Sequence, residues 1–293
     1  RKNVSSHDKL LSLNIQLACS LLKYIRINEI AIPIAEAFEL IKAAYPAAEL
    51  DPHIASLVCL PPNTSGIADF VKKHRISHGS TGADDGLVSS FIIQDKASCM
   101  PAQVLFDEYK SSASKGKKKS SRRTDFIDAC AAPGNKTSHL ASLVYTHAQQ
   151  DYDANTVYAF DKSVARSKLL SDRMVAAGAL NVTVQNFDFL EVDACAEEYS
   201  DVRYLLLDPS CSGSGVVRAL ERVLETESGL GDGESKDDSL RLKRLQEFQI
   251  QVIAKAMSFP AAEYIVYSTC SIHNEENEDV VQKILEGFPD WDV

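Results

Sequence analysis

From Thr124 onward, short apolar segments alternate with helical ones, and this alternation constrains the fold more than any other feature of the chain. Strands separated by helices pair in parallel, with helices on both faces of the sheet. The sequence therefore predicts an α/β fold. The expected strands are 126–127, 156–160, 182–185, 204–207 and 264–267, and the expected helices are 136–148, 163–177, 240–258 and 276–286.

Polar residues follow the ends of these expected strands, at Asp128, Asp161, Asp188, Asp208 and the run Ser268–Ser271. In open parallel sheets, ligands bind beyond the carboxyl ends of the strands, near the point where the strand order reverses. The sequence thus predicts one ligand site along that edge of the sheet.

The N-terminal third has a different pattern. Apolar residues recur at helical spacing over Leu10–Leu21, and again over 34–45 between Pro33 and Pro46. We expect a smaller, mostly helical accessory region over 1–90 that binds RNA, and a catalytic domain over 91–293. The segment 77–90 is rich in Gly, Ser and Asp and is expected to be a linker or surface loop. Because the chain starts Arg1-Lys2-Asn3, without an initiator Met, we expect a trimmed N-terminus.

Two further segments have biased composition. The strongly basic run 110–123 is a solvated loop or an RNA-contacting arm, and we favour the loop because the run lacks the apolar surface needed to fold. The acidic, Gly-rich run 225–238 is expected to be a loop that avoids RNA.

Charge and cysteine content narrow the function. A net charge of -10 argues against a non-specific nucleic-acid binder, but it allows an enzyme that reads RNA through a local cleft. No apolar run reaches the length of a membrane span, and no signal peptide is visible. The seven cysteines form no CxxC pair, so we expect reduced thiols in an intracellular protein and no metal site.

The loop Asp128–Thr137 is built to hold a ligand close to its backbone. Its residues are small, Gly134 can adopt positive φ, and a helix N-terminus follows that suits a carboxylate such as the amino-acid end of S-adenosylmethionine. Neither a P-loop nor a dinucleotide fingerprint is present. At the next two strand ends, Asp161 is placed to bind ribose hydroxyls and Asp188 to bind an adenine amino group. A turn or helix-cap role is also open for each aspartate.

Two cysteines follow neighbouring expected strands, Cys211 after Asp208 and Cys270 after Tyr267. An acid and two thiols can therefore converge beside a methyl donor. That set suits methylation of cytosine carbon 5, which is a poor nucleophile until a thiolate adds to carbon 6. The acid then stabilises the adduct at ring nitrogen 3, and the base must be unstacked to enter the site.

These motifs together resemble the Sun-type RNA (cytosine-5) methyltransferases, and in particular the branch that modifies large-subunit ribosomal RNA. The resemblance runs from about Gln94 to Val281. It rests on Gln94–Ser98, Asp128–Thr137, Asp161, Asp188, Asp208–Gly215, Tyr267–Ser271 and Asn274–Glu278. It implies a Rossmann-like class I methyltransferase sheet, S-adenosylmethionine as cofactor and an RNA substrate. It also implies a monomer that is located in the nucleus, within the nucleolus.

The resemblance also implies residue roles. Cys270 is the nucleophile, Cys211 assists release of the methylated RNA, and Asp208 lies between cofactor and cytosine. Asp161 binds ribose, Arg166 lies near the cofactor, and Asp188 contacts adenine. The residues implied to line the cofactor are Cys130, Ala131, Ala132, Pro133, Gly134, Asn135 and Lys136.

The chain departs from the family pattern in three places. Asn135 stands where a second glycine is usual, and Asp208-Pro-Ser-Cys211 replaces the commoner Asp-Ala-Pro-Cys with the same spacing. The chain also stops at Val293, before the last two strands expected of the fold, so we expect a truncated C-terminal edge.

Two other functions compete with this interpretation. An amino-group methyltransferase would explain Asp208-Pro-Ser, but its motif needs an aromatic residue where Cys211 stands and gives Cys270 no role. A non-catalytic ribosome-assembly factor would bind RNA without transferring a methyl group.

Overall fold

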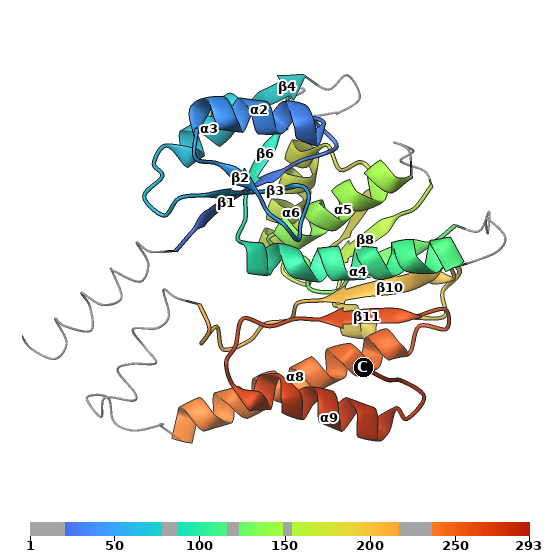
Figure 1. Cartoon of the computed structure of the whole chain (residues 1–293). Coiled ribbons are helices and arrows are strands. Elements are labelled where there is room, and N and C mark those ends of the chain that lie inside the picture. The colour runs from blue at the N-terminus through green and yellow to red at the C-terminus, as the bar shows by residue number, and fades with distance from the viewer. Residues whose placement is uncertain (1–20, 78–86, 116–122, 149–153, 217–235) are drawn as a thin grey trace, which may run out of the picture. The chain divides into compact units, whose positions relative to one another are not determined.

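The computed structural model describes residues 21–77, 87–115, 123–148, 154–216 and 236–293 (Figure 1). The chain divides into two compact units. We call Leu22–Asp208 with Lys255–Tyr267 the sheet unit, and the described residues of Pro209–Ala254 with Ser268–Val293 the cysteine unit.

A five-stranded sheet, all parallel, forms the centre of the sheet unit, in the order β11-β10-β7-β8-β9. Its strands are β7 (Asp125–Asp128), β8 (Val157–Phe160), β9 (Val182–Gln185), β10 (Val202–Leu207) and β11 (Tyr264–Tyr267). All five expected strands are thus confirmed, and so is the α/β class. The chain adds β8 and β9 on one side of β7, then β10 and β11 on the other, so the strand order reverses between β7 and β10.

Helices cover one face of this sheet, and aromatic side chains cover the other. The helices are α4 (Lys96–Lys115), α5 (Asn135–His147) and α6 (Val164–Ala177). Ala159 of β8 packs with residues of α5 and α6. Its neighbour Phe160 points the opposite way, because side chains alternate along a strand, and it contacts Phe189 and Tyr199. These two lie in the short helices η1 (Phe189–Glu191) and η2 (Glu197–Tyr199), and both contact Phe259.

The expected mostly helical character of the N-terminal region is wrong for its described residues. A four-stranded antiparallel sheet, in the order β2-β3-β1-β6, is built from β1 (Lys23–Ile27), β2 (Glu49–Leu50), β3 (Leu57–Leu60) and β6 (Phe91–Ile93). The helices here are α2 (Ile34–Ala44), which confirms the expected helix, and α3 (Ile67–Lys73). These strands are only two to five residues long, and they are defined by pairing across the chain, which no local period reveals. Except for Leu21, the segment Leu10–Leu21 lies outside the described residues.

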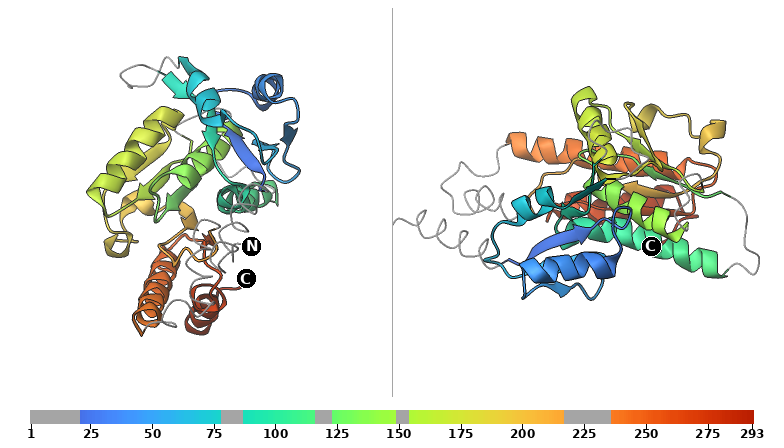
Figure 2. Two further views of the ribbon diagram at one scale, coloured as in Figure 1. Left: turned by 90° about the vertical axis from the view of Figure 1, so that its left-hand side faces the viewer. Right: turned by 90° about the horizontal axis from the view of Figure 1, so that it is seen from above.

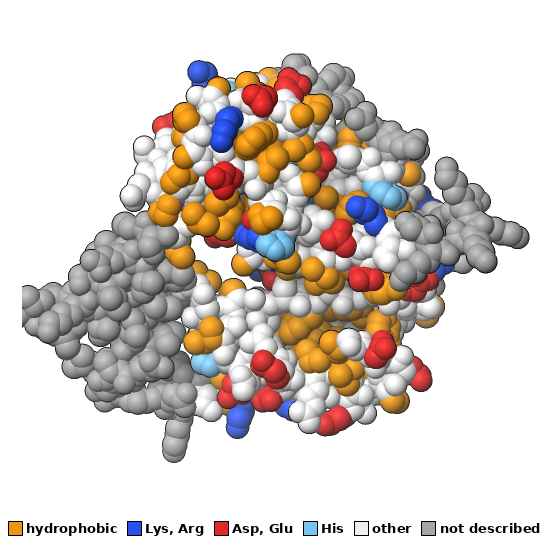
Figure 3. All heavy atoms as spheres, in the orientation of Figure 1, with side chains coloured by type: hydrophobic (Ala, Val, Ile, Leu, Met, Phe, Trp, Pro, Cys, Tyr) orange, Lys and Arg blue, Asp and Glu red, His pale blue; other side chains and the backbone are white. Residues whose placement is uncertain are grey.

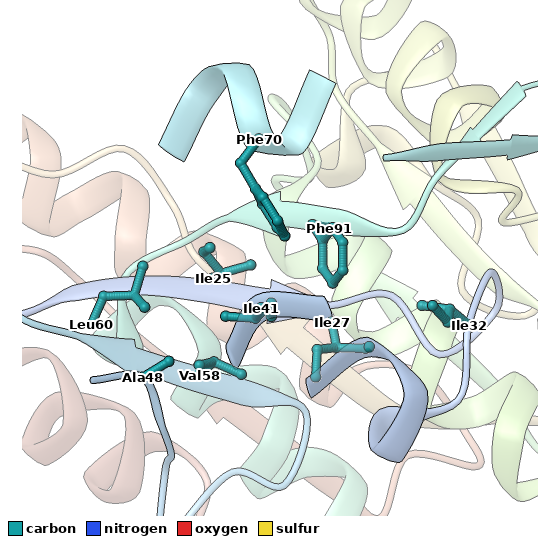
Figure 4. Close-up of a cluster of buried hydrophobic side chains, with 10 residues drawn as sticks. Ile25, Ile27, Ile32, Ile41, Ala48, Val58, Leu60, Phe70 and Phe91 are labelled. Atoms are coloured by element: carbon teal, nitrogen blue, oxygen red, sulfur yellow. The ribbon is translucent and has the colours of Figure 1, made fainter. Parts of the chain in front are cut away.

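A compact apolar cluster joins this smaller sheet to α2 (Figure 4). Ile25 and Ile27 of β1 lie in it with Ile41 of α2 and Phe91 of β6, all at most 1% exposed. Figure 2 gives two further views of this sheet beside the parallel sheet in the same unit.

The segments of biased composition, 77–90, 110–123 and 225–238, are described in part, and their described residues include helix and strand. α4 continues through Lys115, so the first residues of the basic run 110–123 are helical and not a loop, because they extend a helix already begun at Lys96. Residues 116–122 lie outside the described chain. The expected linker 77–90 includes the end of strand β4 (Arg75–Ser77) and strand β5 (Leu87–Ser89), which pair antiparallel, with 78–86 not described. Most of the acidic run 225–238 also lies outside the described chain, and α8 begins at Lys236.

Two helices frame the cysteine unit, α8 (Lys236–Met257), of which this unit holds the part up to Ala254, and α9 (Glu278–Gly287). A short helix, η4 (Asn274–Glu276), precedes α9. Gln246 of α8 links the two, since its Nε2 donates to the carbonyl oxygen of Glu275 at 2.6 Å and its Oε1 accepts from Lys283 at 2.9 Å. Both expected helices of this region are confirmed.

Replacing Phe91 with Ala should lower the free energy of unfolding by about 3–5 kcal/mol, because a fully buried ring leaves a cavity in the cluster. The matched control is Ile93→Ala on the same strand, which is 50% exposed and should cost about 1 kcal/mol or less. Urea unfolding followed by circular dichroism measures both. Equal losses would contradict the placement of the cluster.

Candidate active site

The reversal of strand order brings together side chains from two strand ends. Lys136 Nζ, in the first turn of α5 after β7, lies 2.7 Å from Asp208 Oδ2, directly after β10. Leu206 of β10 pairs with Asp128 of β7, so both loops leave the sheet at the same level. Of the polar residues predicted to gather at this edge, Asp208 thus lies against the loop that follows β7, where it contacts Lys136.

The loop between β7 and α5 is fixed at several points. The Ala131 N–H donates to the Phe160 carbonyl at the end of β8 at 2.9 Å. Gly134 has φ +104°, and a Cβ there would lie 2.9 Å from both Leu170 Cδ1 and Met174 Cε of α6. Glycine is needed here both for its backbone conformation and for this close packing on α6.

The N-terminus of α5 offers an anion site. No side chain caps it in the described structure, and its first turn carries no acidic residue. Backbone N–H groups of a first helical turn lack partners within the helix and point toward the N-terminus, where the helix dipole is positive. This end of α5 can therefore bind a carboxylate.

Asp161, at the end of β8, is nearly buried and holds the same loop from the other side. Its Oδ1 accepts from the Ser163 N–H at 2.9 Å, and its Oδ2 lies 3.3 Å from Arg166 Nη2. The same Nη2 donates to the Ala132 carbonyl at 2.6 Å. Arg166 therefore bridges Asp161 and the loop Asp128–Thr137.

Asp188 lies just beyond β9 and forms a helix cap. Its Oδ1 accepts from the Leu190 N–H of η1 at 3.1 Å, and its Oδ2 lies 3.5 Å from Lys162 Nζ. The cap role left open by the sequence is thus observed. A cap uses one oxygen of the carboxylate and leaves the other able to accept from a ligand.

Cys130 lies in the loop Asp128–Thr137, and it is a poor nucleophile. Burial raises the pKa of its thiol to about 12, and the carboxylates of Asp128, Asp161 and Asp208 add to the effect. Because the thiolate is the reactive form, Cys130 stays uncharged and unreactive at neutral pH.

The two cysteines predicted to act together do lie together in the cysteine unit. Cys211 Sγ and Cys270 Sγ are 3.0 Å apart, and the Cys270 N–H donates to Cys211 Sγ at 3.3 Å. Cys270 is exposed and Cys211 is half-buried, and neither forms a disulfide. The Gly215 N–H donates to the Cys270 carbonyl at 2.9 Å, which ties one loop to the other.

A buried carboxylate anchors these loops. Glu276, in η4, has no exposed surface and accepts from the Ser212 N–H at 2.9 Å and from Gln249 Nε2 at 3.0 Å. Burial alone would raise the pKa of Glu276, but hydrogen bonds from Ser212, Ser271 and Gln249 outweigh burial and hold it below its usual range. The hydroxyls of Ser212, Ser214 and Ser271 also lie 3.1–3.2 Å from one another.

The sequence interpretation gave no roles to Glu276 and the three serines. Asn274–Glu278 and Ser271 were part of the resemblance, but nothing in their spacing indicates that an acidic residue turns inward beneath the cysteine loops.

Within the described ranges, no group of three or more His, Cys, Asp or Glu side chains could hold a metal ion. None of the helices in that part of the chain is long and apolar enough to cross a membrane. In the coloured part of the surface in Figure 3, Lys and Arg side chains are scattered singly among other residues.

The proteins that this chain resembles in sequence are all named as rRNA methyltransferases in the comparisons that follow. A family model described as 16S rRNA methyltransferase RsmB/F matches residues 118–293. The 25S rRNA (cytosine-C(5))-methyltransferase rcm1 of Schizosaccharomyces pombe is 34% identical over 294 residues, which cover 99% of this chain and 56% of the relative. A 28S rRNA (cytosine-C(5))-methyltransferase of Mus musculus is 40% identical over 195 residues, covering 67% of this chain and 36% of the relative. The chain thus spans about half the length of the fission yeast relative, and the match to the mouse relative covers about a third of that protein.

Solved structures share the fold. NSun6 from Pyrococcus horikoshii with SFG has a TM-score of 0.59 at 20% identity, covering 98% of this chain and 85% of that one. A methyltransferase homolog protein from the same organism has a TM-score of 0.58 at 23% identity, covering 94% and 74%.

The buried carboxylate of Asp128 should make stability depend on pH. Burial raises its pKa to about 7, although the Thr137 hydroxyl donates to it at 2.8 Å. Because the folded pKa lies above the unfolded value of about 3.8, stability from this group is full at low pH and is lost as the pH rises through about 7.

Asp128→Asn removes this titration. Between pH 4 and 8, the free energy of unfolding of the variant should therefore rise relative to that of the wild type, by up to about 4 kcal/mol. Urea unfolding at several pH values measures the difference. Asp172→Asn, on the exposed surface of α6, controls for the loss of one charge. A gap between wild type and Asp128→Asn that stays constant with pH would refute the assignment.

Proposed function

Because the chain belongs to the Sun-type RsmB/F family of rRNA methyltransferases, we propose that it methylates carbon 5 of cytosine in large-subunit ribosomal RNA, with S-adenosylmethionine as methyl donor. The observation that carries the proposal is the pair of thiols, Cys211 and Cys270, with their sulfur atoms 3.0 Å apart. Methylation of an amino group gives a thiol pair no role, whereas methylation of carbon 5 needs a nucleophile and a means of release.

The residues of the sheet unit fit S-adenosylmethionine. The uncapped N-terminus of α5 suits its carboxylate. Gly134 lets the loop pack closely against α6, because a side chain there would clash with that helix. The carboxylates of Asp161 and Asp188 stand at the next two strand ends, where ribose and adenine bind in folds of this kind. Cys130, Ala131, Ala132, Pro133, Asn135, Lys136 and Arg166 complete the lining. When bound, the cofactor supplies an electrophilic methyl group.

Cys270 begins the reaction by attacking the cytosine ring. Its sulfur bonds to carbon 6, which breaks the aromaticity and makes carbon 5 nucleophilic. The addition places negative charge on the ring, and a proton delivered to ring nitrogen 3 through Asp208 neutralises it. Lys136 Nζ, 2.7 Å from Asp208 Oδ2, holds the Asp208 side chain in place. Carbon 5 then takes the methyl group. Loss of the carbon 5 proton restores the ring double bond as the bond from carbon 6 to sulfur breaks, and the nitrogen 3 proton leaves through Asp208.

Cys211 assists this last step. Its sulfur lies 3.0 Å from that of Cys270, so one proton can be shared between the two before the substrate binds. Once Cys270 is bonded to carbon 6, Cys211 gives up that proton to solvent and acts as a thiolate base. We assign to Cys211 the proton that leaves carbon 5, and thereby the release of Cys270 from the methylated base.

The RNA must be bound by local surfaces, because the chain as a whole carries a net charge of -10. We assign RNA binding to the N-terminal accessory region, 1–90, and catalysis to 91–293. A ribosomal RNA substrate places the protein in the nucleus, at the nucleolus, where it acts as a monomer on pre-ribosomal particles.

Cys270→Ala should lower methylation by about 10⁴-fold or more, because the variant lacks the sulfur that the mechanism bonds to carbon 6. Bisulfite sequencing of large-subunit rRNA after incubation with enzyme and cofactor measures it. Cys195→Ala, an exposed thiol outside the pair, should keep full activity. Full activity of Cys270→Ala would contradict the covalent mechanism. Methylation of an exocyclic amino group would instead favour an amino-group methyltransferase.

Cys211→Ala should instead accumulate a covalent complex, because Cys270 can attack but the adduct is not released. A shifted RNA–protein band on a denaturing gel detects the complex, and the double variant Cys211→Ala/Cys270→Ala should not form it. If the wild type binds RNA but neither methylation nor an adduct is found, the chain is a binding factor and not an enzyme.

A further inference from the structure

A fully buried arginine contacts the first turn of α5, directly after the loop Asp128–Thr137. Arg26, on β1 of the smaller sheet, has no exposed surface. Its Nε donates to Gln94 Oε1 at 2.7 Å, and its Nη2 donates to Ser138 Oγ of α5 at 2.7 Å and to the Asn135 carbonyl at 3.5 Å. Its Nη1 has no hydrogen-bond partner among the described residues.

The charge of Arg26 is poorly balanced. No carboxylate in the described chain lies within ion-pair distance of it. Burial lowers its pKa to about 10, so it is still charged at neutral pH. Burial is the largest influence on this pKa, and the charges of two acidic groups, Cys99 first and Glu29 second, oppose it. Burial also raises the pKa of Glu29, in spite of the attraction of Arg26. His139 is buried beside it, and burial first and Arg26 second keep its pKa well below the usual value, so this ring is uncharged.

This arrangement is unfavourable in the absence of an anion. A cation at a helix N-terminus opposes the helix dipole, and a buried charge without a partner costs several kcal/mol. Arg26 nevertheless contacts the first turn of α5 through Ser138 and Asn135, at the helix end that has no side-chain cap. Helix dipole and guanidinium together concentrate positive potential at one place.

We propose that Arg26 is a positioning residue for the carboxylate of the cofactor, whose binding supplies the missing negative charge. The inference rests on the proposed function, and it gives the smaller sheet a part in cofactor binding. Arg26 does not touch the carboxylate. It acts through the first turn of α5, which it fixes by hydrogen bonds and makes more positive by its charge.

A purely architectural role is the alternative, since β1 is tied to α5 and α6 by other bonds as well. The Glu29 N–H donates to Ser142 Oγ at 3.1 Å, and Asn28 Nδ2 donates to the Ala177 carbonyl at 2.8 Å. Loss of an architectural link would weaken every ligand of the loop alike. Loss of a charge that serves the carboxylate would weaken only ligands that carry one.

Two ligands separate these roles. S-adenosylhomocysteine carries the amino-acid carboxylate and ammonium, and 5′-methylthioadenosine has the same nucleoside without either group. Loss of a positive charge weakens binding of the carboxylate and not of the ammonium, so a lower preference for S-adenosylhomocysteine reports on the carboxylate. Titration calorimetry gives the ratio of their affinities for the full chain at pH 8. Arg26→Met should lower this preference for S-adenosylhomocysteine about tenfold, whereas Arg26→Lys, which keeps the charge, should retain most of it. Arg203→Gln, near the start of β10 and away from the loops, should leave the ratio unchanged.

A second variant keeps the test decisive if Arg26→Met does not fold. Glu29→Gln removes the opposing charge from a partly exposed position, so the preference for S-adenosylhomocysteine should rise two- to threefold. A ratio unchanged in every folded variant would overturn the role of Arg26 while leaving the cofactor assignment intact. A wild-type chain that binds neither ligand would overturn the proposed function instead.

Discussion

The pairing of β10 with both of its neighbours fixes the geometry on which the candidate site depends. Leu206 pairs with Asp128 of β7, and Leu207 pairs with Tyr267 of β11. Because the strands are parallel, their carboxyl ends coincide, so Asp208 emerges beside the loop that carries Lys136. The same register starts the two cysteine loops from paired residues, four and three residues before Cys211 and Cys270. A slip of one residue would turn every side chain of β10 to the opposite face and separate Asp208 from Lys136.

Two buried carboxylates have pKa values shifted in opposite directions, and the difference follows from their hydrogen bonds. Asp128 accepts from the Thr137 hydroxyl and from the Cys130 backbone, and burial dominates, so its pKa rises to about 7. Glu276 accepts from Ser212, Ser271 and Gln249, which outweigh burial, so it stays ionised. The ionised group is the one that holds a backbone N–H directly after Cys211. The titrating group precedes the helix end proposed to bind the cofactor carboxylate, and a neutral carboxyl there opposes a second carboxylate less than a charged one would.

The sequence predicts the sheet well and the buried charges poorly, for physical reasons. Parallel strands covered on both faces are short apolar runs, so β9 and β11 begin and end where expected. The smaller sheet was missed because strands such as Glu49–Leu50 are too short to show a period. Continuation of α4 through Lys115 was missed because serine and lysine carry no apolar stripe there. Arg26 and Glu276 resemble surface residues in a sequence, since only tertiary packing turns a charged side chain inward.

Exposure and anchoring separate the roles of the two thiols. Cys130 and Cys99 are poor nucleophiles, because burial raises the pKa of Cys130 to about 12 and that of Cys99 to about 11. Cys270 is exposed and can reach a base that enters from solvent. Cys211 is half-buried, and the residue after it is held by Glu276, so its sulfur has little freedom to move toward a substrate. Its sulfur stays 3.0 Å from that of Cys270, a distance at which a proton can be shared between the two. These differences support the proposed division of roles, in which the cysteine that solvent reaches is the nucleophile and the anchored cysteine acts as a base.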